Sequence, residues 1–561
     1  MREPRGGLIM KKAGYFVGSC LAIILLLSGC GKKQSAENSG NLKANMATKQ
    51  VVNWSETEDL TTLDPSKLTQ PIDITMVGNT NEGLYRLGNH HKLLPGIATK
   101  MTESRDGKVY TFNLRKNAKW SNGDAVVAHD FEYSWKRTIN PKTVSQYGYI
   151  FDGIKNANKI QARKAKPSTL GVKAIGKYKL QVTLERPIPY FKLLMAFPLF
   201  FPQNQKAVEK YGKAYGTSSA KMVYNGPFKM NGWTGTNEKW TLTANKNYWD
   251  KKHVYLEKIN DQVVKDPSTM YNMYQGNQLD VATLSGTQVK NELNNKDMHV
   301  LKDSRIFYLE FNQRTRPAFK NKALRQAFSY AMDRQSLTKN VLADGSVPAQ
   351  GFVTQGLASN PKTGEDFTKE AKQGNVGLEY NPTKAKAAYK QVLKELHKKS
   401  LQLEVLCGDS TAAKHSAAYV QGQLEKILPN LKISIASVPL KSLIQRQTHH
   451  QFDFFVSNWG ADYSYPYTFL QVLQSNNTFN EGGWTNKNYD KLVQKSASTD
   501  ATNPQKRWQD MIDASRVIMS DQGVAPLYQA TISQMRKAKI KGIIYNSAGL
   551  SFNLKGMYVA K

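Results

Sequence analysis

The sequence predicts a mixed α/β protein with several domains, and three observations support this fold class. The chain has 561 residues, which at roughly 100–200 residues per domain predicts about three or four domains. Hydrophobic residues make up 40% of the chain and aromatic residues 10%, enough apolar material for folded cores. From Val51 onward, short segments of alternating apolar residues, typical of strands, are interleaved with segments of helical periodicity. A mean hydropathy of −0.54 excludes a polytopic membrane protein.

The first segment of the chain is typical of an export signal. Two lysines precede an apolar run of 13 residues, 15–27, which is too short to span a bilayer comfortably. Met10 fits the start of such a signal better than Met1. We therefore predict a signal peptide over residues 1–29 and an exported protein.

A cysteine stands directly after this apolar run. The segment Leu27-Ser28-Gly29-Cys30 resembles a bacterial lipobox, the signal for diacylglyceryl attachment to the cysteine and for cleavage before it. The resemblance implies that Cys30 becomes the first mature residue and anchors the protein to the outer face of the cell membrane. The alternative is an ordinary secretory signal with an incidental cysteine. Residues 30–48, rich in Ser, Asn, Lys and Gly, predict a flexible tether.

Six segments carry clear secondary-structure signals. Alternation of apolar and polar residues predicts strands, and apolar residues at helical spacing predict helices. Asn381-Pro382 and Leu428-Pro429 supply helix start and stop signals. The predicted strands are residues 109–114, 179–184 and 401–406, and the predicted helices are residues 321–332, 383–397 and 416–428.

The net charge is strongly positive. The chain carries +34 at pH 7 and has a pI of about 9.7, and 61 of its basic residues are lysines against 17 arginines. Base readout in nucleic acids favours arginine and a clustered basic face, whereas these lysines are spread over the whole chain. We predict no nucleic-acid partner; the charge suits a solvated surface near anionic wall polymers or lipid head groups.

Local motifs do not indicate an enzyme. Residues 171–178 almost match a phosphate-binding loop, but Tyr178 stands where a hydroxyl ligand of Mg²⁺ is required, so a hairpin turn at Gly176 is the better interpretation. Residues 218–221 and 362–364 imitate two elements of penicillin-binding proteins, but the third is missing. The adjacent histidine pairs at 90–91 and 449–450 have no third residue at metal-ligand spacing. The three cysteines match no zinc or redox motif. We predict a binding protein without cofactor or metal.

Several blocks resemble bacterial extracellular solute-binding proteins of peptide ABC importers, the oligopeptide-binding type. In the longest pair of blocks, Asn122-Gly123 predicts a turn, and Phe131, Tyr133 and Trp135 supply apolar bulk. We expect core packing from these blocks, not ligand contacts. The matching blocks are residues 62–65, 81–86, 112–124, 130–137, 224–228, 247–250 and 319–334, so the resemblance runs from about Val51 to the end.

The block that resembles the family's ligand site is residues 458–463. In relatives such a segment lines the cleft, and its aspartate holds the α-ammonium of a bound peptide while the backbone pairs with the extended ligand. The resemblance assigns the ammonium contact to Asp462. The candidate ligand-binding residues in this segment are Asn458, Trp459, Gly460, Ala461, Asp462 and Tyr463.

The resemblance places residues 69–72 in the opposing cleft wall, with Thr69, Gln70 and Pro71 as candidate contacts. Pro71 departs from the family pattern, because it offers a carbonyl group but no N–H for a ladder hydrogen bond. A second departure lies before Trp459, where some relatives have an arginine that reaches a short peptide's carboxylate and this chain has residues 455–458, Phe-Val-Ser-Asn. A fixed short peptide length is therefore not predicted.

The fold that the resemblance implies is the two-lobed periplasmic-binding-protein type II fold with a hinge. Lobe one is expected over residues 49–303 and 525–561, with an inserted subdomain at about 89–217, and lobe two over 304–524. The implied function is capture of oligopeptides and delivery to the permease and ATPase subunits of an ABC importer, by a monomer. The alternatives are the same fold with a nickel chelate, haem or a sugar as ligand, or a cell-wall enzyme.

Overall fold

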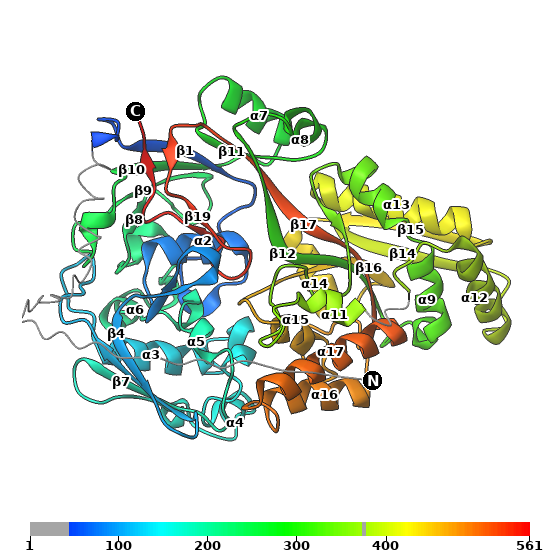
Figure 1. The fold of residues 1–561 in the computed structure, drawn as a ribbon, viewed down its shortest axis with the longest axis horizontal. Coiled ribbons are helices and arrows are strands. Elements are labelled where there is room, and N and C mark those ends of the chain that lie inside the picture. The colour runs from blue at the N-terminus through cyan, green and yellow to red at the C-terminus, as the bar shows by residue number, and fades with distance from the viewer. Residues whose placement is uncertain (1–43, 373–376) are drawn as a thin grey trace, which may run out of the picture. The chain divides into compact units, whose positions relative to one another are not determined.

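A large mixed sheet runs through residues 47–561 of the computed structural model, which describes residues 44–372 and 377–561 (Figure 1). The predicted signal peptide, Cys30 and most of the tether lie outside the described residues. The sheet order is β15 (Leu431–Val438), β14 (Leu401–Gly408), β16 (Phe454–Gly460), β12 (Met298–Phe311), β17 (Val524–Arg536), β11 (Val281–Leu284), β1 (Val51–Glu56), β10 (Lys258–Val263), β9 (Lys239–Ala244) and β8 (Phe228–Asn231). The short strand β13 (Val347–Pro348) pairs with β17 outside this order.

Two long antiparallel strands, β12 and β17, join the two halves of the sheet. The end of β17 pairs with β11 on one side of the molecule, and the end of β12 pairs with β16 on the other. Their mutual register shifts between Lys302 and Ile306, which marks an irregularity in the ladder. The predicted boundaries between the lobes, at residues 303–304 and 524–525, lie on these strands.

The half that contains β14, β15 and β16 is a layered α/β structure. Strands β14 and β15 are parallel, and α13 (Thr411–Ile427) connects them as a crossover helix. The second buried core lies between this sheet and the helices α9 (Lys322–Tyr330), α12 (Pro382–Glu395) and α13, with Phe328, Tyr389 and Val420 among its members. This arrangement confirms all three predicted helices within a few residues at each end.

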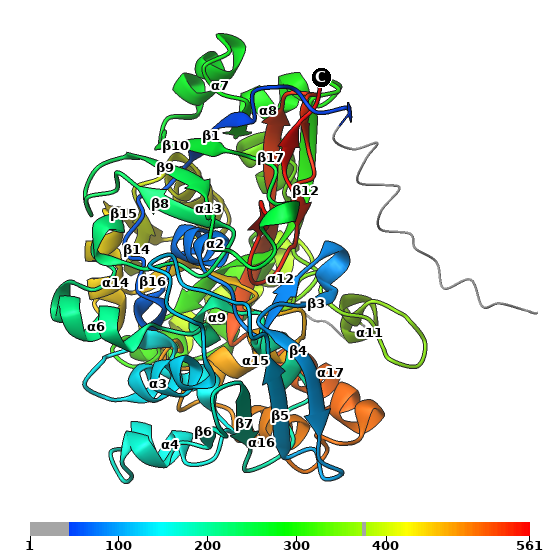
Figure 2. The same cartoon turned by 90° about the vertical axis from the view of Figure 1, so that its left-hand side faces the viewer.

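The other half contains the remaining strands, α2 (Pro71–Thr80) and a separate four-stranded sheet. This smaller sheet has the order β4 (Ala98–Glu103), β5 (Val109–Leu114), β7 (Lys179–Thr183) and β6 (Val172–Ala174), and Figure 2 shows β4 and β5 apart from β8–β10. It lies within the predicted insertion at 89–217, whose limits remain a prediction, as do those of the two lobes. The predicted strands at 109–114, 179–184 and 401–406 are confirmed as β5, β7 and β14.

The near-match to a phosphate-binding loop is a hairpin turn, as expected. Strands β6 and β7 are antiparallel neighbours, and Gly176 between them has a φ of +78°, which favours glycine because a side chain would be strained there. Gly123, in the other predicted turn, likewise has a φ of +95°.

The family's longest blocks are used in packing, which confirms that expectation. Phe131 and Trp135 are fully buried on α3 (Ala128–Ile139), and the indole N–H of Trp135 donates to the carbonyl of Phe200 at 2.9 Å. Asp130 closes the start of α3 by accepting from the backbone N–H of Val127 at 2.9 Å.

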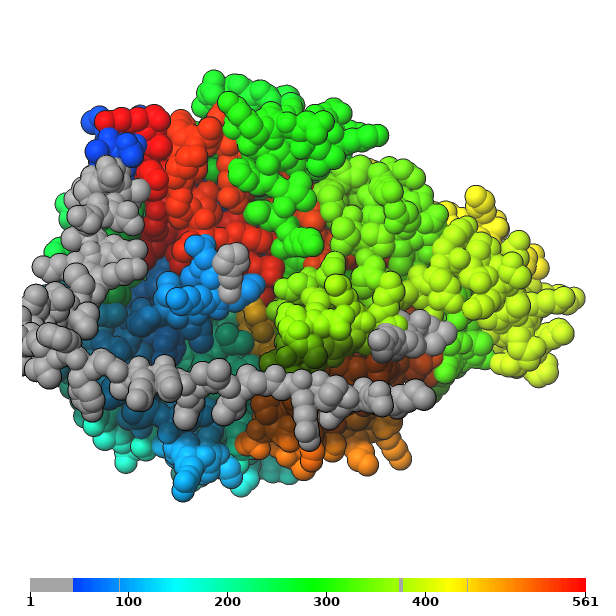
Figure 3. All heavy atoms as spheres, viewed as in Figure 1, coloured from blue at the N-terminus to red at the C-terminus, as the bar shows by residue number. Residues whose placement is uncertain are grey.

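The C-terminal residues return to the first half. The backbone N–H of Ala47 donates to the carbonyl of Val559 at 2.9 Å, and the side-chain amide of Gln50 donates to the same carbonyl. Figure 3 shows this start of the compact unit beside the C-terminal residues. Within the described residues, no helix has the length and apolar character needed to cross a bilayer.

Candidate functional site

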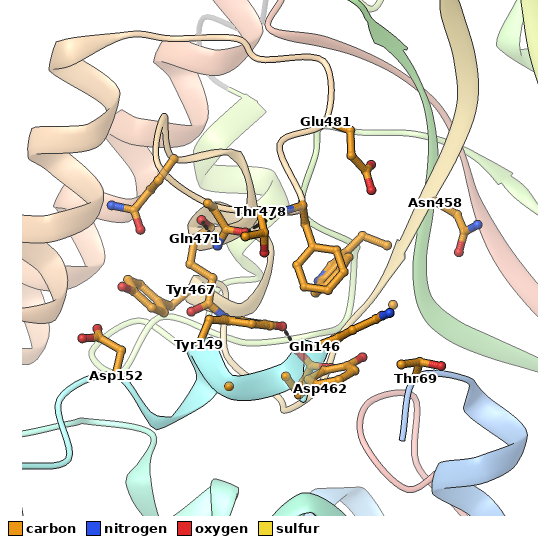
Figure 4. Close-up of a pocket in the computed structure, with 18 of the residues that line it drawn as sticks. Thr69, Gln146, Tyr149, Asp152, Asn458, Asp462, Tyr467, Gln471, Thr478 and Glu481 are labelled. Atoms are coloured by element: carbon orange, nitrogen blue, oxygen red, sulfur yellow. Dashed lines mark hydrogen bonds between the residues drawn. The ribbon is translucent and has the colours of Figure 1, made fainter. Parts of the chain in front are cut away.

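A cavity of about 1260 Å³ lies where segments from both halves of the large sheet approach one another. Its walls are the start of α2, the short helix η3 (Gln146–Phe151), β16 with the residues after it, and the loop 474–481 (Figure 4). Small-molecule sites usually occupy about 300–1,000 Å³. This cavity is therefore large enough for a ligand of several residues.

The structure brings eight of the nine predicted site residues to this cavity, although 69–71 and 458–462 are far apart in sequence. The exception is Tyr463, which lines a smaller neighbouring pocket and stacks on Tyr190 with ring centroids 4.7 Å apart. Whether the eight contact a ligand stays a prediction. They are Thr69, Gln70, Pro71, Asn458, Trp459, Gly460, Ala461 and Asp462.

Helix geometry explains the unusual proline in the opposing wall. Pro71 is the first residue of α2, where the backbone N–H has no intrahelical partner and a proline costs nothing. Asp73 fixes this helix start by accepting from the backbone N–H groups of Gln70 at 3.3 Å and Thr61 at 2.9 Å. The wall at 69–71 is therefore a rigid helix entrance.

Asp462 is a buried carboxylate at the centre of the cavity wall. It is 5% exposed, and its Oδ2 accepts from the hydroxyl of Tyr149 at 3.2 Å and that of Thr468 at 3.4 Å. Burial raises its pKa to about 7, and hydrogen bonds from neighbouring hydroxyl groups partly oppose the rise. Among the described residues no ion pair includes Asp462, so within that part of the chain its carboxylate has no cationic partner.

The turn that carries Asp462 is held in place by Thr468. The backbone N–H of Asp462 donates to the Thr468 hydroxyl at 3.1 Å, and the indole N–H of Trp459 donates to the Thr468 carbonyl at 3.0 Å. Trp459 therefore has a structural role in addition to lining the cavity, because its ring fixes the loop that presents the carboxylate.

Two tyrosines from the opposite half cover Asp462. Tyr147 and Tyr149 lie on η3 with ring centroids 5.8 Å apart, and burial together with the charge of Asp462 raises the pKa of each well above its ordinary value. Sequence reasoning missed both, because no motif separates these tyrosines from the many other aromatic residues of the chain.

Arg305 on β12 is a second cavity residue that sequence reasoning missed. Its guanidinium donates to the side-chain oxygen of Asn458 at 2.9 Å and pairs with Asp303 at 3.3 Å. Its charge is thus paired within the protein, and two of its five N–H donors make hydrogen bonds. Within the described residues, no group of three His, Cys, Asp or Glu side chains is arranged to hold a metal ion. His449 and His450 follow α14 (Leu440–Thr448) and do not lie on a strand.

Two halves of one sheet, joined by two long strands and enclosing a large cavity, define a two-lobed solute-binding fold. The chain matches the family model described as bacterial extracellular solute-binding proteins, family 5, over residues 92–512, and it belongs to this family.

Relatives of similar length support this assignment. The chain is 36% identical to the dipeptide-binding protein of Lactococcus lactis subsp. cremoris, over 96% of this chain and 98% of the relative. The structure of Listeria monocytogenes OppA bound to peptide matches with a TM-score of 0.85 and 39% identity, over 92% of this chain and 100% of that one. The two-lobed fold class predicted from the sequence is confirmed.

Two structures of the murein tripeptide-binding protein MppA allow a comparison of conformations. The chain matches the Escherichia coli protein with a TM-score of 0.83 and the unliganded open form with 0.66, in each case at 27% identity and over 92% of this chain, with 99% and 98% of the other chains covered. The described unit resembles the first arrangement more than the open one.

Proposed function

We propose that this protein captures peptides by their free amino terminus and delivers them to an ABC importer while anchored to the cell surface through Cys30. The observation that carries the proposal is the buried Asp462 carboxylate, which lines a large cavity and has no cationic partner among the described residues. The peptide-binding relatives support the choice of ligand.

Electrostatics favours a cationic ligand group at Asp462. A buried carboxylate is costly in its charged form unless a cation or several hydrogen-bond donors compensate it. Hydroxyl groups of Tyr149 and Thr468 supply part of this compensation, yet its pKa stays raised to about 7. A peptide α-ammonium brings a full positive charge and three hydrogen-bond donors, so it can supply the compensation that the Asp462 carboxylate still lacks.

The main chain beside Asp462 offers a place for an extended ligand. β16 pairs with β12 along one edge, whereas β14 reaches only Phe454 and Phe455 on the other edge. Residues 456–460 therefore have no second strand partner within the described part of the chain. An extended peptide can add to this edge as a strand, which gives affinity without dependence on its sequence.

Other ligands of the same fold make different demands. A sugar has no cationic group for Asp462, and a nickel chelate or haem would leave the free strand edge without a partner. A cell-wall enzyme, the rival from another class, predicts covalent labelling by a β-lactam, so an unlabelled protein argues against it.

The test is to identify and then exchange the natural ligand. We expect mass spectrometry of material that co-purifies with the protein to detect peptides. Calorimetry should then show that a peptide with a free amino terminus binds far more tightly than its N-acetylated form. Equal binding of the two forms, or co-purification of a sugar or metal chelate, would refute the proposal.

A further inference from the structure

The charge of the cavity is opposite to that of the chain. The chain carries +34, yet no lysine is among the described side chains that line the cavity. Both lining arginines are engaged: Arg186 pairs with Asp152, and Arg305 pairs with Asp303. The other lining acids form no ion pair among the described residues; they are Glu185, Asp462, Glu481 and Asp490.

Glu481, which is half-buried, is the lining acid that stands beside a buried carboxylate, that of Glu310. It lines the cavity from the loop after Phe479, and Figure 4 shows its side chain extending into the cavity on the side of Asn458. Glu310 on β12 lies next to it: the backbone N–H of Gly482 donates to its Oε1 at 2.7 Å. Burial, and after it the charge of Glu310, raises the pKa of Glu481 well above its ordinary value.

One oxygen of Glu310 has no partner. The residue is 2% exposed, and its Oε2 is a buried atom without a hydrogen bond in the described structure. Burial raises the pKa of Glu310 to about 7, and hydrogen bonds from the backbone N–H of Gly482 and the Ser457 hydroxyl partly oppose the rise. Arg314 is the cation that acts on it, but the two do not form an ion pair, and the Arg314 guanidinium donates instead to the carbonyl of Asn480 at 3.2 Å.

The register of β12 and β16 places Glu310 close to the cavity, although Glu310 is not itself one of the described lining residues. Tyr308 pairs with Ser457 across the two strands, and Glu310, two residues on, shares the face of Tyr308 because side chains alternate along a strand. Ser457, like Tyr308, lines the cavity. A buried carboxylate oxygen without a partner is costly, so the unpaired oxygen of Glu310, next to the half-buried Glu481 in the cavity wall, indicates a place for a cation.

We propose that Glu481 and Glu310 form a subsite for a positively charged side chain, lysine or arginine, of the bound peptide, so that the protein selects cationic peptides. The inference rests on the proposed peptide function and adds a substrate class to it. Ser457 precedes Asp462 by five residues, at most about 16 Å if the chain were extended throughout, and β16 ends at Gly460. A peptide held at Asp462 therefore reaches the subsite at or before its sixth residue.

The test is a scan of alanine-based hexapeptides with a free amino terminus, measured by calorimetry on the full-length chain at 150 mM salt. Each of positions two to six carries in turn lysine, Nε-acetyl-lysine, which keeps the shape but removes the charge, or glutamate. At one position we expect lysine to bind about 10-fold to 150-fold more tightly than acetyl-lysine, the range for hydrogen bonds to charged groups. Glutamate should bind more weakly still.

Variants assign this preference to the pair. In Glu481→Gln and in Glu310→Gln the preference for lysine should fall to within about threefold of none, whereas Glu185→Gln should keep it. Glu185 is a matched control because it also lines the cavity, but its Oε1 accepts from the backbone N–H of Asn156 at 2.8 Å. The Nε-acetyl comparison on the wild-type protein needs no variant, so it holds even if one variant folds poorly.

The outcomes separate the two proposals. If peptides bind and N-acetylation still weakens them, but lysine and acetyl-lysine are equivalent at all five positions, the subsite is wrong and the peptide function stands. If no peptide binds, both are wrong. Binding of Ca²⁺ or Zn²⁺ to the peptide-free protein that disappears in Glu310→Gln would assign the pair to a metal ion and overturn the side-chain subsite.

Discussion

The pH dependence of peptide affinity is the sharpest test of Asp462. Its pKa is raised to about 7 by burial, whereas the α-amino group of a peptide has a pKa of about 7.7–8.0. The proposed contact needs the carboxylate charged and the amine protonated. Affinity should therefore rise with pH up to about 7, reach a maximum between about 7 and 8, and fall above it.

The magnitude follows from the fraction of Asp462 that is ionised. At pH 5 about 1% of a carboxyl group with a pKa of about 7 is charged, so Kd should be about 100-fold weaker than at the maximum. Replacement by Asn removes the charge and leaves the ligand cation buried without a partner, which costs roughly 2–5 kcal/mol. That corresponds to about 30-fold to several thousand-fold in Kd, and it limits how far the affinity can fall in acid.

The assay is calorimetry with one peptide from pH 5 to pH 9, on wild type, Asp462→Asn and the control Asp490→Asn. Asp490 lines the same cavity, but its carboxylate accepts from the backbone N–H and the hydroxyl of Ser475. The acid limb should vanish in Asp462→Asn and persist in the control. An unchanged acid limb in Asp462→Asn would mean that another group holds the ammonium.

Three further predictions follow. Saturating peptide should compact the protein in small-angle scattering and stabilise it by about 2.7 kcal/mol at 100 times Kd; confirmed binding without compaction contradicts a closing cleft. Cys30→Ser should leave the protein unprocessed at that site or release it into the medium, and a variant that partitions with membranes like wild type rules out lipidation at Cys30. If the lobes stay closed in the peptide-free protein, Asp462 keeps its raised pKa, so raising the pH from 4 to 7 should cost wild type up to about 4 kcal/mol of stability relative to Asp462→Asn, by denaturant unfolding; parallel curves for the two proteins would mean that the carboxylate is not buried before peptide binds.

The sequence predicted helices and strands well in segments where alternation or a capping residue gives the signal. Alternating residues in 109–114 and the Asn381-Pro382 start signal correspond to β5 and α12, because strand alternation and helix capping involve near neighbours in sequence. The sequence did not predict which strands pair with one another. No local pattern shows that β12 pairs with both β16 and β17.

The candidate site likewise contains residues that one sequence block identifies and residues that only the folded structure brings together. Asp462 and Trp459 stand in a contiguous block, so resemblance to a family could single them out. Tyr149, Glu310 and Glu481 come from three distant segments. Their importance arises from mutual burial, which sequence spacing does not encode, and the same holds for the Thr468 side chain that fixes the Asp462 turn.

The position of Asp462 under Tyr149 couples its charge to the arrangement of the lobes. On the predicted lobe boundaries, Tyr149 lies in the first lobe and Asp462 in the second, so we expect their 3.2 Å contact to form only when the lobes approach. Opening returns water to the carboxylate, whereas closing without a ligand cation buries it at a cost of up to about 4 kcal/mol above pH 7.

This coupling predicts that Asp462→Asn closes more readily than wild type without peptide, because the neutral amide removes the penalty for burying a charge. Small-angle scattering of the peptide-free proteins at pH 8 should show a smaller radius of gyration for the variant, and the difference should shrink at pH 5, where wild type is protonated. Asp490→Asn should behave like wild type at both pH values. Identical scattering of Asp462→Asn and wild type at pH 8 would mean that the carboxylate does not oppose closure, and the ammonium would then select the ligand without controlling the hinge.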